Sequence, residues 1–158
     1  MGALAVLKRD HQEIKKLFFM FEKIDSHEGK KMGDLFKEIK SAVEFNFEVE
    51  EEAFYSVIES DSLEMEIVVM HCLNEHREIR DLLKDLSKRY PFEREFLGEM
   101  RLLNDRMRGH MGVEERKLFR KVREMMPAKV LKQVGREMES KREELRFLQQ
   151  EESAAVAA

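Results

Sequence analysis

Apolar side chains recur at three- and four-residue steps along almost the whole chain, and this period predicts amphipathic α-helices. The first helix is predicted from Ala3 to about Asp25. The residues of its apolar stripe are Leu4, Leu7, Ile14, Phe18 and Phe21. By the same criterion, further helices are predicted over about residues 32–59, 61–88, 92–125 and 127–150.

Turn-forming residues separate these segments. Gly29 lies in the first connection, Pro91 lies in the third, and Pro127 suits the first turn of the last helix. Asp61 followed by Glu64 has the spacing of a capping box, so Asp61 is the predicted N-cap of the third long helix. Amphipathic helices of about 20 to 30 residues with short connections favour an antiparallel bundle.

The predicted fold class is therefore all-α. Residues 1–125 should form an antiparallel up-and-down four-helix bundle, and residues 126–152 an additional C-terminal helix. This extra helix is expected to pack on the bundle or against a partner chain, in which case the protein would be a homodimer. Residues 153–158 are expected to form a frayed tail.

Several polar residues interrupt the apolar stripes at inward-facing positions. Residues of this kind are His11, Asn46, Glu50, His76, His110 and Glu114. Each pair 46/50 and 110/114 is four residues apart, so its two side chains lie about one turn apart on the same helix face. Buried polar groups cost several kcal/mol each if they are charged and unpaired, so this set needs partners.

Two parts of the chain repeat each other. Residues 10–18 match residues 75–83, with His, Glu, Ile and Leu in register at an offset of 65. Residues 46–51 match residues 110–115 at almost the same offset. The chain therefore consists of two similar helix hairpins, and such a repeat predicts a bundle with a pseudo-twofold axis.

A metal centre would satisfy these buried polar groups. Four imidazole-or-amide positions and two carboxylates could hold two ions, with the carboxylates as bridges. The nitrogen and oxygen donors fit iron, manganese or zinc, whereas a structural zinc site would need a set of thiolates. Cys72 is the only cysteine and is more often a small buried hydrophobic residue than a ligand.

Composition narrows the class of protein further. The net charge is −4, and 39% of the residues are charged with both signs interspersed, so no nucleic-acid partner is expected. No run approaches the roughly 18 to 20 apolar residues that a membrane span needs, so no membrane partner is expected either. With one cysteine and no apolar run of signal-peptide length, a cytoplasmic location is expected.

Four motifs in order resemble the hemerythrin-like (HHE cation-binding) family. They are Asp10-His11-x2-Ile14, Asn46-x3-Glu50-Glu51, Glu75-His76-x2-Ile79 and His110-x3-Glu114-Glu115-x2-Leu118-Phe119. Together they cover about residues 4–122. The resemblance implies a centre of two non-haem iron ions, bridged by oxide or hydroxide, inside a four-helix bundle.

The resemblance also implies roles for individual residues. His11, His76 and His110 would be terminal ligands, and Glu50 and Glu114 would be bridging carboxylates. Glu115 is a register alternative, because the oxygen carriers of the family use a carboxylate five residues after the histidine. On a regular helix Glu115 would point about 100° away from Glu114, so Glu114 is preferred.

The sequence departs from the family at two positions. Asn46 stands where the repeat and the family predict histidine, and an amide oxygen is a weaker ligand than an imidazole. Cys72 stands where the oxygen carriers have a histidine four residues before His76. Both changes argue against reversible oxygen carriage and favour redox chemistry, sensing or iron handling.

The predicted function is a hemerythrin-like non-haem iron protein that reacts with or senses O2, peroxide or nitric oxide. Manganese or zinc could replace iron, and an enzymatic activity, if there is one, would be redox chemistry on peroxide or nitric oxide. Alternatives are an iron-handling protein and a metal-free or mononuclear-metal bundle with an interaction or regulatory role. A ferritin-like site is excluded, because the chain contains no Glu-x-x-His.

Overall fold

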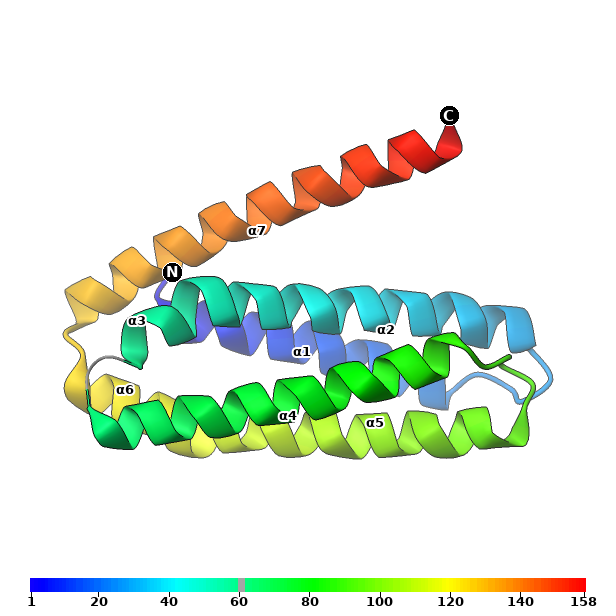
Figure 1. The fold of residues 1–158 in the computed structure, drawn as a ribbon, viewed down its shortest axis with the longest axis horizontal. Helices are drawn as coiled ribbons and strands as arrows, with labels where there is room; N and C mark the ends of the chain where they lie inside the picture. The colour runs from blue at the N-terminus through cyan, green and yellow to red at the C-terminus, as the bar shows by residue number, and fades with distance from the viewer. Residues whose placement is uncertain (60–61) are drawn as a thin grey trace.

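The structure is a computed structural model that describes residues 1–59 and 62–158. It confirms the all-α bundle with an extra C-terminal helix (Figure 1). The helices, with π-helical turns labelled η, are α1 (Ala3–Glu22), α2 (Gly29–Val49), η1 (Glu50–Tyr55), α3 (Ser56–Ile58), α4 (Leu63–Ser87), α5 (Arg94–Val113), η2 (Glu114–Leu118), α6 (Phe119–Met125) and α7 (Ala128–Ala157).

The bundle is built from two hairpins. Helix α1 packs against α2, and α4 packs against α5. Figure 1 shows α1, α2, α4 and α5 running lengthwise beside one another, with α7 on one side. The two hairpins are those that the repeat predicts.

Two apolar clusters fill the bundle, one towards each end. The first contains Leu7, Phe54 and Phe119, and the second contains Ile14 and Phe96. On α1, the boundary between the clusters falls between residues 7 and 14, which is where His11 lies. The polar layer is therefore enclosed by hydrophobic side chains on both sides, which limits the access of water to it.

The third long helix begins one residue later than the sequence predicts. Ser62 is its N-cap, and its side chain accepts a hydrogen bond from the backbone N–H of Met65 at 3.2 Å. A serine in this role satisfies one of the free N–H groups of the first turn. The predicted cap, Asp61, lies outside the described residues.

A π-helical turn interrupts each of two long helices at the same place in the repeat. Turn η1 starts at Glu50 and turn η2 starts at Glu114. A π turn contains one extra residue, so it changes the direction of the side chains that follow it, and such turns are frequent at functional sites. The sequence-based expectation of unbroken helices over 32–59 and 92–125 did not include them.

Helix α7 packs against α1, α2 and η1. Its buried residues are Val134, Gly135, Met138 and Arg142, and all residues from 146 onward are exposed. Figure 1 shows its C-terminal half extending away from the bundle. The helix ends at Ala157, beyond the predicted end near Gln150, because alanine in this last segment favours helix.

Across residues 1–59 and 62–158, each helix is too short or too polar to span a lipid bilayer.

Candidate metal centre

The structure brings the six inward-facing polar residues together in one buried layer. They are His11 (α1), Asn46 (α2), Glu50 (η1), His76 (α4), His110 (α5) and Glu114 (η2), and none is more than 1% exposed. All four long helices of the bundle thus contribute to one site. Groups of this kind occur in protein interiors only where hydrogen bonds, ion pairs or metal ions compensate the loss of water.

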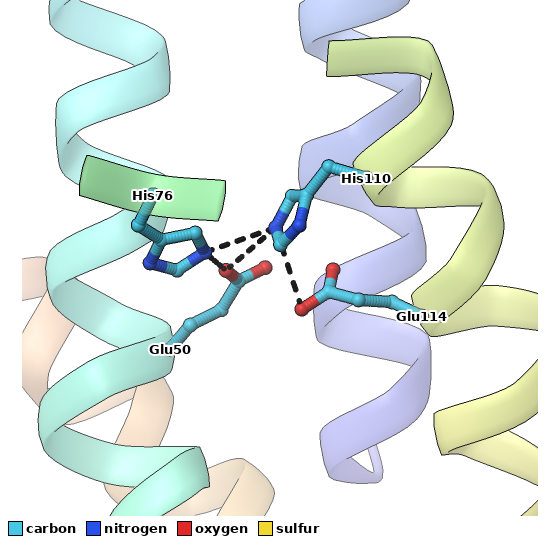
Figure 2. Close-up of side chains that lie close together, drawn as sticks. All are labelled: Glu50, His76, His110 and Glu114. Carbon is cyan, nitrogen blue, oxygen red and sulfur yellow. Dashed lines mark hydrogen bonds and ion pairs between the residues drawn. The ribbon is translucent and has the colours of Figure 1, made fainter. Parts of the chain in front are cut away.

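Four of these residues form a tight group, shown in Figure 2. Glu50, His76, His110 and Glu114 each offer one ligand atom, and these atoms all lie within 4.8 Å of one another. The Nε2 atoms of the two histidines are 2.9 Å apart. His76 Nε2 is 3.1 Å from Glu50 Oε2, and His110 Nε2 is 3.6 Å from Glu114 Oε1. Two imidazoles and two carboxylates thus converge on one point.

His11 lies on the other side of the two carboxylates. Its Nε2 is 3.1 Å from Glu114 Oε2 and 3.4 Å from Glu50 Oε1. Each glutamate therefore directs one oxygen towards His11 and the other towards the pair His76 and His110. This is the arrangement that two carboxylates need in order to bridge two neighbouring ions.

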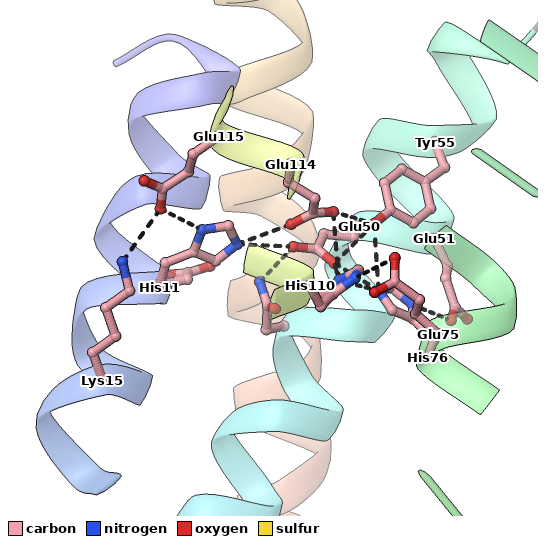
Figure 3. Close-up of polar contacts among 12 residues, drawn as sticks. His11, Lys15, Glu50, Glu51, Tyr55, Glu75, His76, His110, Glu114 and Glu115 are labelled. Carbon is pink, nitrogen blue, oxygen red and sulfur yellow. Dashed lines mark hydrogen bonds and ion pairs between the residues drawn. The ribbon is translucent and has the colours of Figure 1, made fainter. Parts of the chain in front are cut away.

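The second glutamate of each Glu-Glu pair orients a histidine of the opposite hairpin (Figure 3). Glu115 Oε1 lies 2.8 Å from His11 Nδ1, and Glu51 Oε1 lies 2.8 Å from His76 Nδ1. A carboxylate that accepts the Nδ1–H leaves Nε2 free to face the centre. Glu115, the register alternative to Glu114, thus lies on the outer side of His11.

His110 has a similar outer neighbour. Its Nδ1 lies 3.6 Å from Glu75 Oε1, which comes from the residue just before His76. Each of the three imidazoles therefore has an acidic side chain near Nδ1, within hydrogen-bond distance at His11 and His76 but not at His110. Sequence reasoning did not identify Glu51 and Glu75 in this role, although both stand beside predicted ligands in the repeat.

Tyr55 also reaches the centre. Its hydroxyl oxygen lies 3.3 Å from Glu50 Oε2 and from His76 Nε2, and it donates a short hydrogen bond to Glu114 Oε1. On a regular α-helix, Tyr55 would point about 140° away from Glu50. Turn η1 brings the two to the same side, which is why the sequence alone left the role of this tyrosine unassigned.

Asn46 is within hydrogen-bond distance of a predicted bridge. Its Nδ2 donates to Glu50 Oε1 at 3.0 Å, while its Oδ1 has no hydrogen-bond partner among the described residues. In this orientation the amide supports the carboxylate. With the amide rotated, the oxygen would face the same point that His11 faces.

Cys72 is fully buried at the edge of the centre. Its sulfur forms a second close group with Glu75 and His110 rather than joining the group of four. Burial, followed by the nearby charge of Glu114, raises the pKa of the Cys72 thiol far above its ordinary value. Because only the thiolate is a good ligand, this residue is a weaker candidate than the imidazoles.

Opposite charges of the buried imidazole and carboxylate groups compensate one another. Burial alone would lower the pKa of His11, but hydrogen bonds and ion pairs with Glu114 and Glu50 outweigh it and raise the pKa to about 10. Burial would raise the pKa of Glu50, yet its hydrogen bonds with three imidazoles hold that pKa well below its usual value. The ionised carboxylate of Glu50 therefore faces a protonated His11, and a bound cation would replace the proton of that imidazole.

The donor set fits metal ions on chemical grounds. One position would be held by His76, His110 and the two shared carboxylates, and a second by His11 with the other oxygens of the same carboxylates. Glu114 Oε2 is fully buried, and its 3.1 Å contact with His11 Nε2 does not have the geometry of a good hydrogen bond. A carboxylate oxygen with this orientation is better satisfied by a cation than by the protein around it.

Replacement of Tyr55 with phenylalanine tests whether the hydroxyl belongs to the centre. The variant should retain the fold, because the ring stays buried, but it should change the metal affinity or the metal spectrum of the loaded protein. Ser56→Ala, a neighbouring substitution whose exposed hydroxyl donates to the Glu52 carbonyl, is the matched control. Identical metal titrations for both variants and the parent would exclude a role for the Tyr55 hydroxyl.

Comparisons with known proteins agree with this geometry. A family model described as the hemerythrin HHE cation-binding domain matches residues 2–122. A crystal structure of a hemerythrin HHE cation-binding domain-containing protein from Mycobacterium kansasii has the same fold, with a TM-score of 0.81 and 22% identity. That match covers 93% of this chain and 88% of the other. A search of curated proteins finds no match.

Proposed function

This chain belongs to the hemerythrin HHE cation-binding domain family, and we propose that its cation centre is a pair of non-haem iron ions. One observation carries the proposal. Glu50 and Glu114 each direct one oxygen to the His11 side and one to the side of His76 and His110. Imidazole and carboxylate donors suit iron, and they also accept manganese or zinc.

The two positions would differ in strength. The position beside His76 and His110 would have two imidazoles, whereas the position beside His11 would have one imidazole and Asn46. A small molecule can bind a metal ion only where it displaces water or a weak ligand. The His11 side is therefore the proposed place where O2, peroxide or nitric oxide binds.

The bound iron would supply the redox chemistry, and the protein would determine what reaches it. The apolar clusters on both sides limit water, and Glu51 and Glu115 orient the imidazoles. Tyr55 donates a hydrogen bond to Glu114, one of the shared carboxylates. We further propose that the protein acts in the cytoplasm on a small molecule, without a nucleic-acid or membrane partner. A homodimer through α7 remains a proposal of the same kind.

A second candidate is a mononuclear centre. The close group of four consists of Glu50, His76, His110 and Glu114 and does not include His11. These residues alone would hold one ion. In this case the His11 side would keep its imidazole–carboxylate hydrogen bonds in the loaded protein.

Metal analysis of protein purified without added metal distinguishes these cases. The di-iron proposal expects about two iron ions per chain and an absorption spectrum with oxo-to-iron charge-transfer bands. Loading should also stabilise the fold, by about 2.7 kcal/mol when free metal exceeds its dissociation constant 100-fold. About one ion per chain would favour the mononuclear centre. A metal-free protein whose midpoint of thermal unfolding does not change when iron is added would contradict both the di-iron and the mononuclear proposals.

A further inference from the structure

An acidic residue precedes a histidine in both halves of the repeat, but its partner differs between the two halves. In the second half, Glu75 precedes His76 and faces His110 Nδ1 at 3.6 Å. The equivalent residue in the first half is Asp10, which precedes His11. By the symmetry of the repeat, Asp10 should face the side chain at position 46, where Asn46 replaces the histidine.

Asp10 instead binds a residue from outside the bundle. Arg142 of α7 donates a hydrogen bond from Nη1 to Asp10 Oδ1, across 132 positions of the sequence. Both side chains are almost completely buried, with Asp10 4% and Arg142 3% exposed. Arg142 Nε is also 3.6 Å from Glu139 Oε2, and the half-exposed Arg9 lies 3.8 Å from Asp10.

A small pocket, open to the surface, lies beside this ion pair and reaches Asn46. Its volume is about 150 Å³, and its lining includes Asp10, Asn46 and Arg142 together with Ala42 and Phe45. Asp10 Oδ2 and Asn46 Oδ1 both lack hydrogen-bond partners among the described residues. The pocket offers room beside Asn46 for a larger side chain, and Asp10 Oδ2 offers an acceptor for it.

We infer that Arg142 is a positioning residue that keeps the two metal positions unequal, because it holds Asp10, the carboxylate that would otherwise be free to support an imidazole ligand at position 46. In the second half of the repeat, the acidic residue Glu75 faces the imidazole of His110. In the first half, Arg142 of α7 is the partner of the equivalent acidic residue, Asp10. This inference rests on the proposed metal centre for its effect on affinity, and on the ion pair alone for its effect on folding.

The test is a cycle of four proteins: the parent, Asn46→His, Arg142→Met and the double variant. An outer carboxylate typically changes metal affinity by about 10- to 100-fold. The double variant should therefore retain iron against a competing chelator about 10- to 100-fold better than Asn46→His alone. Equal retention by these two proteins would overturn the inference.

A fifth protein shows whether the gain depends on Asp10. Adding Asp10→Asn to the double variant should remove most of the gain in iron retention. The same substitution added to Asn46→His alone should change iron retention little, because in that protein Arg142 already binds the Asp10 carboxylate. A gain that survives Asp10→Asn in the double variant would contradict the inference.

Thermal unfolding of the metal-free proteins provides a readout that needs no iron. Arg142→Met should lower the midpoint of unfolding, because it leaves the buried Asp10 with only the half-exposed Arg9, 3.8 Å away, as a charged partner. Asn46→His should restore part of the loss. If Arg142→Met does not fold, the double variant should still fold. Additive midpoints, or a double variant that also fails to fold, would overturn the inference. If no protein in the set retains iron while the midpoints remain coupled, the proposed metal function fails, and only the coupling of Arg142 and Asp10 to position 46 stands.

Discussion

In the proposed di-metal centre, Glu50→Gln is expected to abolish stable binding of the two ions. Glu50 directs one oxygen to each side of the centre, so an amide in its place removes a charged donor from both positions at once. The amide nitrogen cannot act as a ligand, and the neutral side chain no longer compensates the cations. Metal analysis and competition with a chelator measure the effect, which should exceed the roughly 10- to 100-fold loss typical of an outer residue.

Glu51→Gln is the matched control. This neighbour in the same turn is partly exposed, contacts His76 Nδ1 from outside and is also held by Arg80 at 2.7 Å. Its loss should weaken metal binding by about 10- to 100-fold without abolishing it. The repeat offers a second pair, with Glu114→Gln predicted to behave like Glu50→Gln and Glu115→Gln like Glu51→Gln. Equal losses from Glu50→Gln and Glu51→Gln would contradict the proposed bridging role of Glu50.

The period of the apolar residues was sufficient to predict most of the fold. Apolar stripes at three- and four-residue steps place residues by helix face, so His11 and His76 stand out as polar residues within such a stripe. The repeat then shows which polar residues belong to one layer. Both signals depend only on the order of residues along the chain, and for this reason they predicted the bundle and the buried position of the inner residues.

The π turns could not be read from the same pattern. A stripe assumes about 100° per residue, and η1 and η2 depart from this where the glutamates lie. Tyr55 therefore reaches the centre from a position that a regular helix would turn away from it. The outer contacts of Glu51 and Glu115 cross from one hairpin to the other, so they depend on how the hairpins meet.

Arg142 interrupts an apolar stripe, but it was not among the residues predicted from the sequence. It lies four residues after Met138 and three before Leu145, which are members of the apolar stripe of the last helix. That is the same interruption that distinguishes His11 in the first helix. A buried arginine needs an anion, but its partner, Asp10, lies 132 positions away and no local pattern connects the two.

Gly135→Ala is expected to displace α7 from the bundle. Gly135 is buried where α7 crosses the start of the chain, and a Cβ there would lie 2.8 Å from the Ala3 backbone nitrogen and 2.9 Å from the Gly2 carbonyl carbon. Backbone atoms at these distances cannot move aside as a flexible side chain can. Overpacking of this kind typically costs about 1 to 3 kcal/mol, which outweighs the gain of up to about 1 kcal/mol that alanine brings to a helix.

Gly98→Ala is the control that separates these two effects. Gly98 lies in α5, and a Cβ added there would meet nothing within 4 Å among the described residues, so only the helix preference of alanine should count. Urea unfolding should show a more stable protein for Gly98→Ala and a less stable one for Gly135→Ala. Because Arg142 lies two turns further along α7, displacement of the helix should also loosen its bond to Asp10. Equal stabilisation by both substitutions would mean that α7 does not pack closely on the first residues of the chain.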